Sequence, residues 1–122
     1  MINFEDYEYL YNADAHFKAM EKFPNGFFQT IVLDNKEGFD ALCWGLAELS
    51  MQAELVRRYK GEDSKPYLTE DKVHALMDYT QTPEALRIVV MAVSKGLTGT
   101  AADEDEEIDE VLAELQKKRT IN

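Results

Sequence analysis

Hydrophobic positions along this 122-residue chain recur mainly three and four residues apart, which is the period of an amphipathic α-helix. The longest such stretch is predicted to begin at Asp34, with Glu37 in capping-box spacing, and to run to Tyr59 or Lys60 before Gly61. Its first apolar row comprises Phe39, Leu42, Cys43, Leu46, Leu49, Ala53 and Val56. A second row, offset around the helix axis, comprises Trp44, Met51, Leu55 and Tyr59. Because two rows cover a wide arc, we expect this segment to be the central helix of a small bundle.

Shorter helices are predicted on both sides of the long one. Asn12 or Asp14 can cap a helix that runs to about Phe23 and places three apolar residues on one face, namely Ala13, Phe17 and Met20. Residues 27–33 form an apolar run that is too short for periodicity to separate helix from strand. We favour a helix there, because the neighbouring segments are helical.

Two further helix starts follow a polar loop over residues 62–67. Thr69 is expected to cap a short helix bearing Val73, Leu76 and Met77. Thr82-Pro83-Glu84 combines a capping threonine with a proline at the first helical position, and it predicts a helix that ends at Gly96. The expected buried residues of that helix are Leu86, Ile88, Val89, Val90 and Val93.

The two ends of the chain differ from this helical middle. Residues 4–11 alternate loosely and carry three tyrosines on one side, which favours a short strand or an extended arm. Small residues and an acidic run, 103–107, come after Gly96, followed by apolar residues at helical spacing, Ile108, Val111, Leu112 and Leu115. The predicted fold class is therefore all-α, with an N-terminal arm over 1–11, a helical domain over 12–96, and a flexible acidic linker with a short amphipathic helix over 97–122.

The charge balance excludes several kinds of partner. The formal net charge is -11, and residues 97–122 hold eight acidic but only three basic residues. Nucleic-acid binding needs clustered lysine and arginine, and anionic membrane surfaces also attract basic segments, so neither partner is expected. A single cysteine, an acidic N-terminus without a signal peptide and no long apolar run lead us to expect a cytoplasmic protein, in the host cell if the chain is viral.

Residues that carry chemistry are sparse. His16 and His74 are far apart and lack cysteine or carboxylate neighbours at metal-ligand spacing, so we interpret them as ordinary helix-surface residues. Cys43 lies on an apolar helix face with no basic group placed to activate it, which predicts a buried, inert thiol. The acidic run has Ile108 where a calcium-binding EF-hand loop requires glycine. We therefore predict no enzyme activity, no cofactor and no metal.

Two apolar rows are candidate partner-binding residues. Trp44, Met51, Leu55 and Tyr59 belong either to the core or to a groove for a helix of another protein, since methionine and aromatic residues line such surfaces. Ile108, Val111, Leu112 and Leu115 span only two to three turns, which cannot hold a helix alone in water. These four residues must dock either on their own domain or on a partner.

Four short motifs follow one another along the chain. They are Tyr7-Glu8-Tyr9-Leu10-Tyr11, Phe17-Lys18-Ala19-Met20-Glu21-Lys22-Phe23, Cys43-Trp44-Gly45-Leu46 and Leu68-Thr69-Glu70-Asp71-Lys72-Val73. Their order over residues 7–95 resembles the tail assembly chaperones of long-tailed bacteriophages, in which an extended segment precedes a hydrophobic-Ala-x-Glu helix, an apolar Gly-Leu helix and a Thr-Glu-x-x-Val helix start. The tyrosines and acids near the N-terminus depart from that pattern, because the family more often has a clear strand there.

The resemblance implies a protein-binding chaperone without enzyme activity. Such a chaperone coats the long, hydrophobic, helical tape measure protein before the tail tube forms around it, and it helps to recruit tail tube subunits. Self-association is also expected, because chaperones that coat a long client often form rings or chains. The net charge supports a different interpretation, an acidic regulator or decoy that binds a basic partner surface. A small helical structural or dimerisation module is the third interpretation.

Overall fold

The computed structural model describes residues 1–99, and within this range the protein is all-α, as predicted. The elements in chain order are the 3-10 helix η1 (Phe4–Asp6), α1 (Ala13–Lys22), α2 (Phe27–Ile31), α3 (Lys36–Tyr59), α4 (Glu70–Leu76), the 3-10 helix η2 (Tyr79–Gln81) and α5 (Thr82–Thr98). Residues 1–99 contain no strand, so the prediction of a short strand over residues 4–11 is wrong. The predicted helix over residues 27–33 is confirmed by α2.

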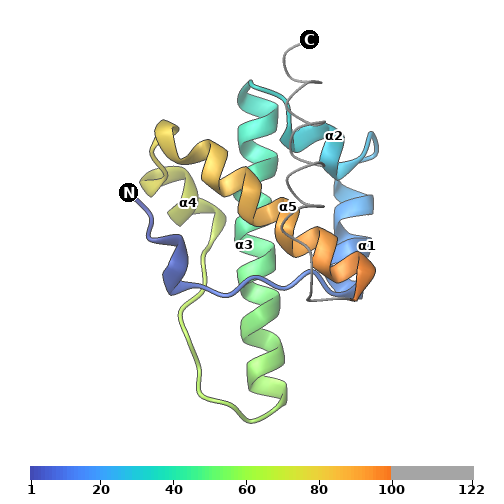
Figure 1. The fold of residues 1–122 in the computed structure, drawn as a ribbon, viewed down its shortest axis with the longest axis vertical. Helices are drawn as coiled ribbons and strands as arrows, with labels where there is room; N and C mark the ends of the chain where they lie inside the picture. Colours follow the sequence, from blue (N-terminus) through green and yellow to red (C-terminus); the bar gives the residue numbers. More distant parts are fainter. Residues whose placement is uncertain (100–122) are drawn as a thin grey trace.

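The longest helix, α3, packs against each of the other four α-helices (Figure 1). Its N-terminus is capped by Asn35, whose side chain accepts a hydrogen bond from the backbone N–H of Gly38 at 2.9 Å. The predicted start at Asp34 with a capping box to Glu37 is therefore wrong by one to two residues, because a different polar residue makes the cap. Beyond α3 the chain reverses at Gly61, which has a φ of 74°.

The core lies where α5 crosses α3 and where α2 and α4 cover it on either side (Figure 1). The first apolar row of α3 supplies Leu42, Cys43, Leu46, Leu49 and Ala53 to this core, and α5 supplies Leu86, Val89, Val90 and Val93, all buried as predicted. Helix α1 contacts α3 through Ala15 and Ala19 instead, which are almost fully buried. The predicted apolar face of Ala13, Phe17 and Met20 is wrong, because these residues point into solvent.

Buried polar residues of α3 hold the segments that pass beside it. Ser50 Oγ accepts a hydrogen bond from the backbone N–H of Leu68 at 2.8 Å, which fixes the chain just before α4. Gln52 Nε2 donates to Asp14 Oδ2 at 2.7 Å, and Gln52 Oε1 accepts from Asn12 Nδ2 at 3.0 Å. These bonds position the N-terminus of α1 on α3, and they satisfy polar groups that burial would otherwise penalise.

The N-terminal arm is a packed part of the domain. The side-chain amide of Gln81 binds both backbone groups of Ile2, accepting from its N–H at 3.1 Å and donating to its carbonyl at 2.8 Å. Farther along, the N–H of Leu10 donates to the carbonyl of Leu49 at 3.0 Å. Three side chains of the arm, Ile2, Phe4 and Tyr11, are buried in the core. The arm therefore adds to the stability of the domain.

Gly96 lies inside α5, so the predicted end of this helix at Gly96 is wrong. The helix continues to Thr98 and is ended by Gly99, which has a left-handed φ of 68° and donates its N–H to the carbonyl of Lys95 at 2.9 Å. A Cβ atom on Gly96 would overlap the carbonyl oxygen of Tyr11 and come within 2.9 Å of its Cβ. This glycine therefore allows the backbone of the arm to cross directly against α5.

Replacing Gly96 with alanine is expected to lower the free energy of unfolding by about 1–3 kcal/mol, because the backbone of Tyr11 must move to make room. An ordinary glycine-to-alanine change within an exposed helix would instead stabilise it by up to about 1 kcal/mol. Urea unfolding followed by circular dichroism measures the sign directly. The neighbouring exposed Lys95→Ala variant is the control, and stabilisation by Gly96→Ala would contradict the close crossing.

Candidate protein-binding surface

The C-terminal half of α3 presents apolar side chains on its surface. Met51, Leu55 and Tyr59 follow one another four residues apart, so they lie along one face of the helix. Met51 is half-buried, whereas Leu55 is 43% and Tyr59 is 95% exposed. In Figure 1 this half of α3 extends beyond the level of α1, α4 and α5. Three of the four residues in the predicted second row therefore lie together on an exposed strip.

Trp44, the first residue of that row, belongs to the core. Its indole packs edge-on against Phe23 and Phe27, with ring centroids 5.3 and 5.5 Å away. Only 9% of its surface is exposed. Trp44 is therefore a core residue that lies next to the buried end of the strip formed by Met51, Leu55 and Tyr59.

A groove of about 560 Å³ connects Trp44 with the exposed strip. Its lining residues come from α3 and from the segment that leads into α4, and they are Trp44, Ala47, Glu48, Met51, Tyr67, Leu68, Thr69, Glu70 and Asp71. Three carboxylates, Glu48, Glu70 and Asp71, line the groove together with the apolar side chains. Protein-binding sites commonly combine apolar and polar residues, and these acidic groups favour a partner whose apolar stripe is flanked by lysine or arginine. We call this groove together with Leu55 and Tyr59 the α3 surface.

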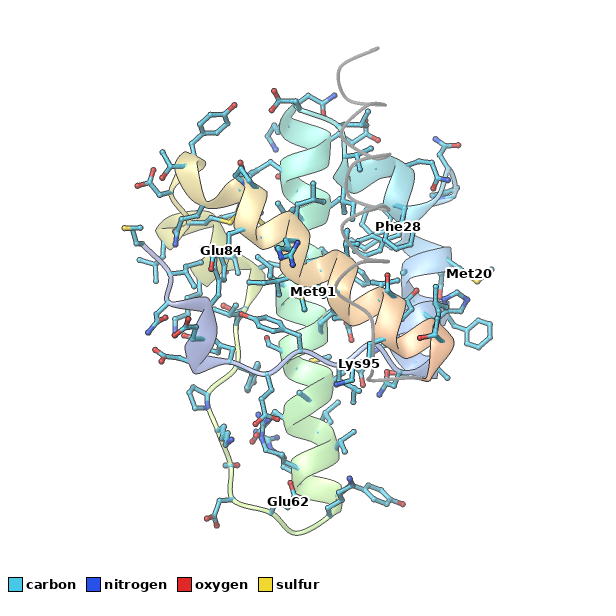
Figure 2. The ribbon with its side chains drawn as sticks, in the orientation of Figure 1. Met20, Phe28, Glu62, Glu84, Met91 and Lys95 are labelled. Atoms are coloured by element: carbon cyan, nitrogen blue, oxygen red, sulfur yellow. The ribbon has the colours of Figure 1, made fainter. Side chains whose placement is uncertain are left out.

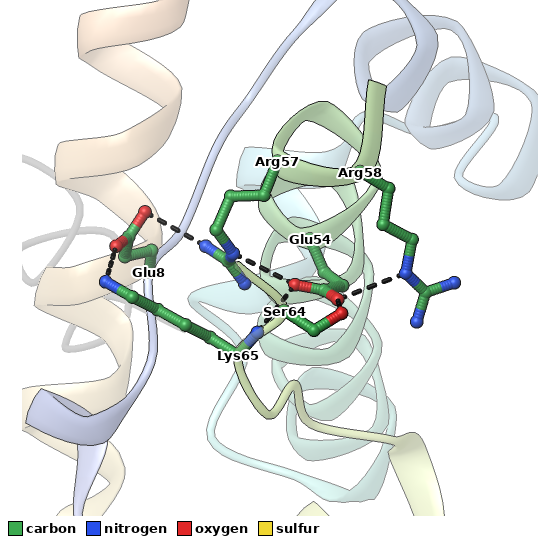
Figure 3. Close-up of polar contacts among 6 residues, drawn as sticks. All are labelled: Glu8, Glu54, Arg57, Arg58, Ser64 and Lys65. Atoms are coloured by element: carbon green, nitrogen blue, oxygen red, sulfur yellow. Dashed lines mark hydrogen bonds and ion pairs between the residues drawn. The ribbon is translucent and has the colours of Figure 1, made fainter. Parts of the chain in front are cut away.

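A cluster of charged residues holds the loop between α3 and α4 beside this surface (Figure 3). Its centre is the buried carboxylate of Glu54, which accepts hydrogen bonds from Ser64 Oγ at 2.6 Å and from the backbone N–H of Lys65 at 3.0 Å. The guanidinium groups of Arg57 and Arg58 donate to the same carboxylate at 2.9 and 3.1 Å. These contacts fix the returning loop, which then brings Tyr67 to the groove.

The same cluster connects the loop with the N-terminal arm. Glu8 accepts from Arg57 Nη1 at 3.0 Å and from Lys65 Nζ at 2.7 Å. The hydrogen bond from Lys65 is the largest of the effects that lower the pKa of Glu8. In Glu54 the backbone N–H of Lys65 and the hydroxyl of Ser64 lower the pKa most, to about 2. The cluster therefore favours the ionised form of both carboxylates.

Acid is expected to destabilise the protein partly through Glu54. Its pKa is 4.5 without the fold and about 2 within it, so the stability it contributes is complete above pH 4.5 and is lost as the pH falls towards 2. We expect the Glu54→Gln variant to be less stable than the parent at pH 7 and to lose less stability between pH 4.5 and 2.5. Urea unfolding at several pH values measures this slope.

The matched control for this acid titration is Glu62→Gln, which removes an exposed carboxylate from the same loop (Figure 2). The control should keep both the stability and the pH slope of the parent. Equal slopes for the parent and Glu54→Gln would show that Glu54 does not stabilise the fold through its charge.

The single cysteine and both histidines of the chain lie within the described residues. Cys43 is buried, as predicted, and burial is the main cause that raises the pKa of its thiol to about 12. His16 is half-buried and hydrogen-bonds Tyr11 Oη through Nδ1 at 2.7 Å, and His74 Nε2 lies 3.7 Å from Asp40 Oδ1. Within residues 1–99 no three histidine, cysteine or acidic side chains converge at metal-binding distance.

Several important residues were missed by the sequence analysis. Tyr67 was assigned to a polar loop, yet it is 38% exposed and lines the groove. Glu54 was not singled out, although its spacing of three and four residues from Arg57 and Arg58 is the usual spacing of helical ion pairs. The bonds from Ser64 and Lys65 had no sequence signal, because they depend on where the loop returns. The predicted binding residues Ile108, Val111, Leu112 and Leu115 lie outside the described residues.

Comparisons with other proteins give this chain no relative. No protein-family model, no curated protein and no solved structure matches it. None of the helices within residues 1–99 has the length and hydropathy needed to cross a membrane.

Proposed function

We propose that this protein is a non-enzymatic chaperone of phage tail assembly that coats and solubilises the tape measure protein. The observation that carries the proposal is the α3 surface, in which Met51, Leu55 and Tyr59 continue an apolar groove onto an exposed helix face. An apolar stripe of a helical client would lie along this face, as amphipathic helices do in hydrophobic grooves. The motif order that resembles tail assembly chaperones supports the tape measure protein as the client.

The distribution of charge supports a role in keeping such a client soluble. Carboxylates of Glu48, Glu70 and Asp71 line the groove, and the chain as a whole has a net charge of -11. A client covered by many copies would acquire a large negative charge, which opposes aggregation. In this proposal α3 is the central helix of the chaperone, the acidic segment 103–107 adds to that charge, and copies associate along the client and recruit tail tube subunits in the host cytoplasm.

Co-expression with the protein encoded just downstream tests the proposal, which requires that protein to be long and helical. That protein should be insoluble alone, become soluble when this chain is present, and co-elute with it during size-exclusion chromatography. The complex should persist at about 1 M salt, where the screening length falls to about 3 Å, because apolar contacts carry most of the binding.

The same experiment separates this function from that of an acidic regulator or decoy. A decoy binds a basic surface through its charge, so its complex should dissociate steeply as the ionic strength rises. A downstream protein that is soluble without this chain, or that never binds it, would exclude the chaperone function.

A further inference from the structure

A second apolar groove lies on the side of the bundle where α5 ends next to α1 and α2. It has a volume of about 290 Å³ and is formed by the end of α1, by α2 and by the last two turns of α5. The apolar lining comprises Met20, Phe23, Phe27, Phe28, Val93 and Leu97. We call it the α1–α5 groove. Figure 2 shows Met20 on α1 and Phe28 on α2, on the side of the molecule where α5 ends.

The rim of this groove exposes apolar side chains that ordinary surfaces avoid. Met20 and Leu97, on α1 and α5, are each 58% exposed, and Phe17, one turn before Met20, is 66% exposed. Phe17 and Met20 belong to the predicted apolar face of α1, which the structure leaves exposed. A contiguous apolar surface of this kind indicates that another segment covers it.

The part of the chain beyond α5 has the composition and the position of such a segment. Ile108, Val111, Leu112 and Leu115 make one apolar stripe at helical spacing, and an isolated helix of this length is not stable in water. The chain leaves α5 at Gly99, two residues after Leu97, which is itself a groove residue. Eight residues separate Gly99 from Ile108, a reach of at most about 30 Å.

We propose that residues 108–115 dock as an amphipathic helix in the α1–α5 groove of their own chain. Their apolar stripe covers Met20, Phe28 and Leu97, and the acidic residues of the segment face solvent. The exposed Lys95, which forms no ion pair within residues 1–99, is the nearest cation of α5 for the acidic run 103–107. This inference is independent of the proposed function, because the groove is separate from the α3 surface.

The short connection favours this occupant over a second copy of the chain. A segment tethered through eight residues is present at an effective concentration on the order of millimolar, well above the concentration of free protein in ordinary solutions. Docking within one chain also removes four apolar side chains from contact with other molecules. A second copy could insert the same segment, but that arrangement would depend on protein concentration.

Disulfide trapping in the full-length protein tests the docking. The Met20→Cys/Leu112→Cys variant should form an intramolecular disulfide under mild oxidation, seen as faster migration on a non-reducing gel at all protein concentrations. Native Cys43 does not interfere, because it is buried and its thiol is kept protonated. We expect this pair to form at least about tenfold faster than the control pair, because docking adds to the local concentration of the two thiols.

The control pair, Met20→Cys/Ala113→Cys, has the same tether length but places the second cysteine on the opposite face of the predicted helix. Equal rates for the two pairs would overturn the proposal. Disulfide-linked dimers that increase with concentration would also overturn it, in favour of insertion into a second copy. Amide hydrogen exchange provides an independent measurement. Leu112→Asp should increase the exchange rate at Met20 and Leu97, whereas Ala113→Asp should leave that rate unchanged. An unchanged rate in both variants would again contradict docking.

Discussion

Replacing Met51 and Leu55 together with aspartate is expected to abolish solubilisation of the client while the domain stays folded. Both side chains lie on the α3 surface, and two new carboxylates there would join Glu48 in an already negative groove. Apolar anchors at the centre of an interface contribute about 2 kcal/mol or more each, so the double variant should bind at least about a hundredfold more weakly. The soluble fraction of the co-expressed client and its recovery in a pull-down measure the effect.

The matched control replaces two other exposed apolar residues with aspartate, Leu76 on α4 and Tyr79 on η2, which are 45% and 73% exposed. It adds the same charge to the protein but leaves the α3 surface intact. The control should retain client binding, and both variants should melt within a few degrees of the parent. Client solubilisation by the Met51/Leu55 variant would show that the client binds elsewhere, whereas unfolding of that variant would show that these side chains belong to the core.

Local signals in the sequence predicted most of the helices. Side chains at helix starts report directly on the backbone, and both Asn12 and Thr69 accept the hydrogen bonds expected of caps, from Ala15 N at 3.0 Å and Lys72 N at 3.2 Å. The first apolar row of α3 and the valines of α5 are buried because their period matches the helix. Caps and periodicity concern residues within four positions of one another, so they can be recognised without knowledge of the fold.

The errors occur where segments distant in the sequence meet. Gly96 was taken for a helix end, but its role is set by the backbone of Tyr11, 85 residues earlier in the chain. At the start of α5, Thr82 was expected to cap the helix, yet it donates its hydroxyl to the carbonyl of Tyr79 because η2 leads directly into α5. Periodicity also gave α1 the wrong buried face, since two alanines pack more closely against α3 than larger side chains could.

The candidate binding surface was predicted only in part for the same reason. The spacing of Met51, Leu55 and Tyr59 placed them on one helix face, but spacing cannot show whether other segments cover that face. Whether this face is covered depends on the path of the loop after α3. Glu54 holds that loop on one side of the helix, which leaves Leu55 and Tyr59 exposed. Tyr67 reaches the groove through the same loop, so its contribution depends on tertiary contacts.

Alanine substitutions at the two ends of the second row, Trp44 and Tyr59, are expected to have very different effects on the free energy of unfolding. Trp44→Ala should lower the free energy of unfolding by about 3–5 kcal/mol, because it removes a buried indole and leaves Phe23 and Phe27 facing a cavity. Tyr59→Ala should change the stability by less than about 0.5 kcal/mol, because 95% of its side chain is exposed. Urea unfolding followed by far-ultraviolet circular dichroism compares both without using the tryptophan signal.

Client binding should depend more on Tyr59 than on Trp44, which is the reverse of the order expected for stability. This difference tests the assignment of the α3 surface. The binding of Trp44→Ala should be measured at a temperature where this variant remains mostly folded. Most of its loss of binding should then be explained by the fraction of molecules that are unfolded, because Trp44 lies at the back of the groove, behind the residues that contact the client. Tyr59→Ala should weaken binding without any change in folding. A Trp44→Phe variant should recover most of the lost stability, because an aromatic ring can still pack against Phe23 and Phe27. If Trp44→Ala were as stable as the parent, the indole would not belong to the core, and the groove would extend through its position to α1.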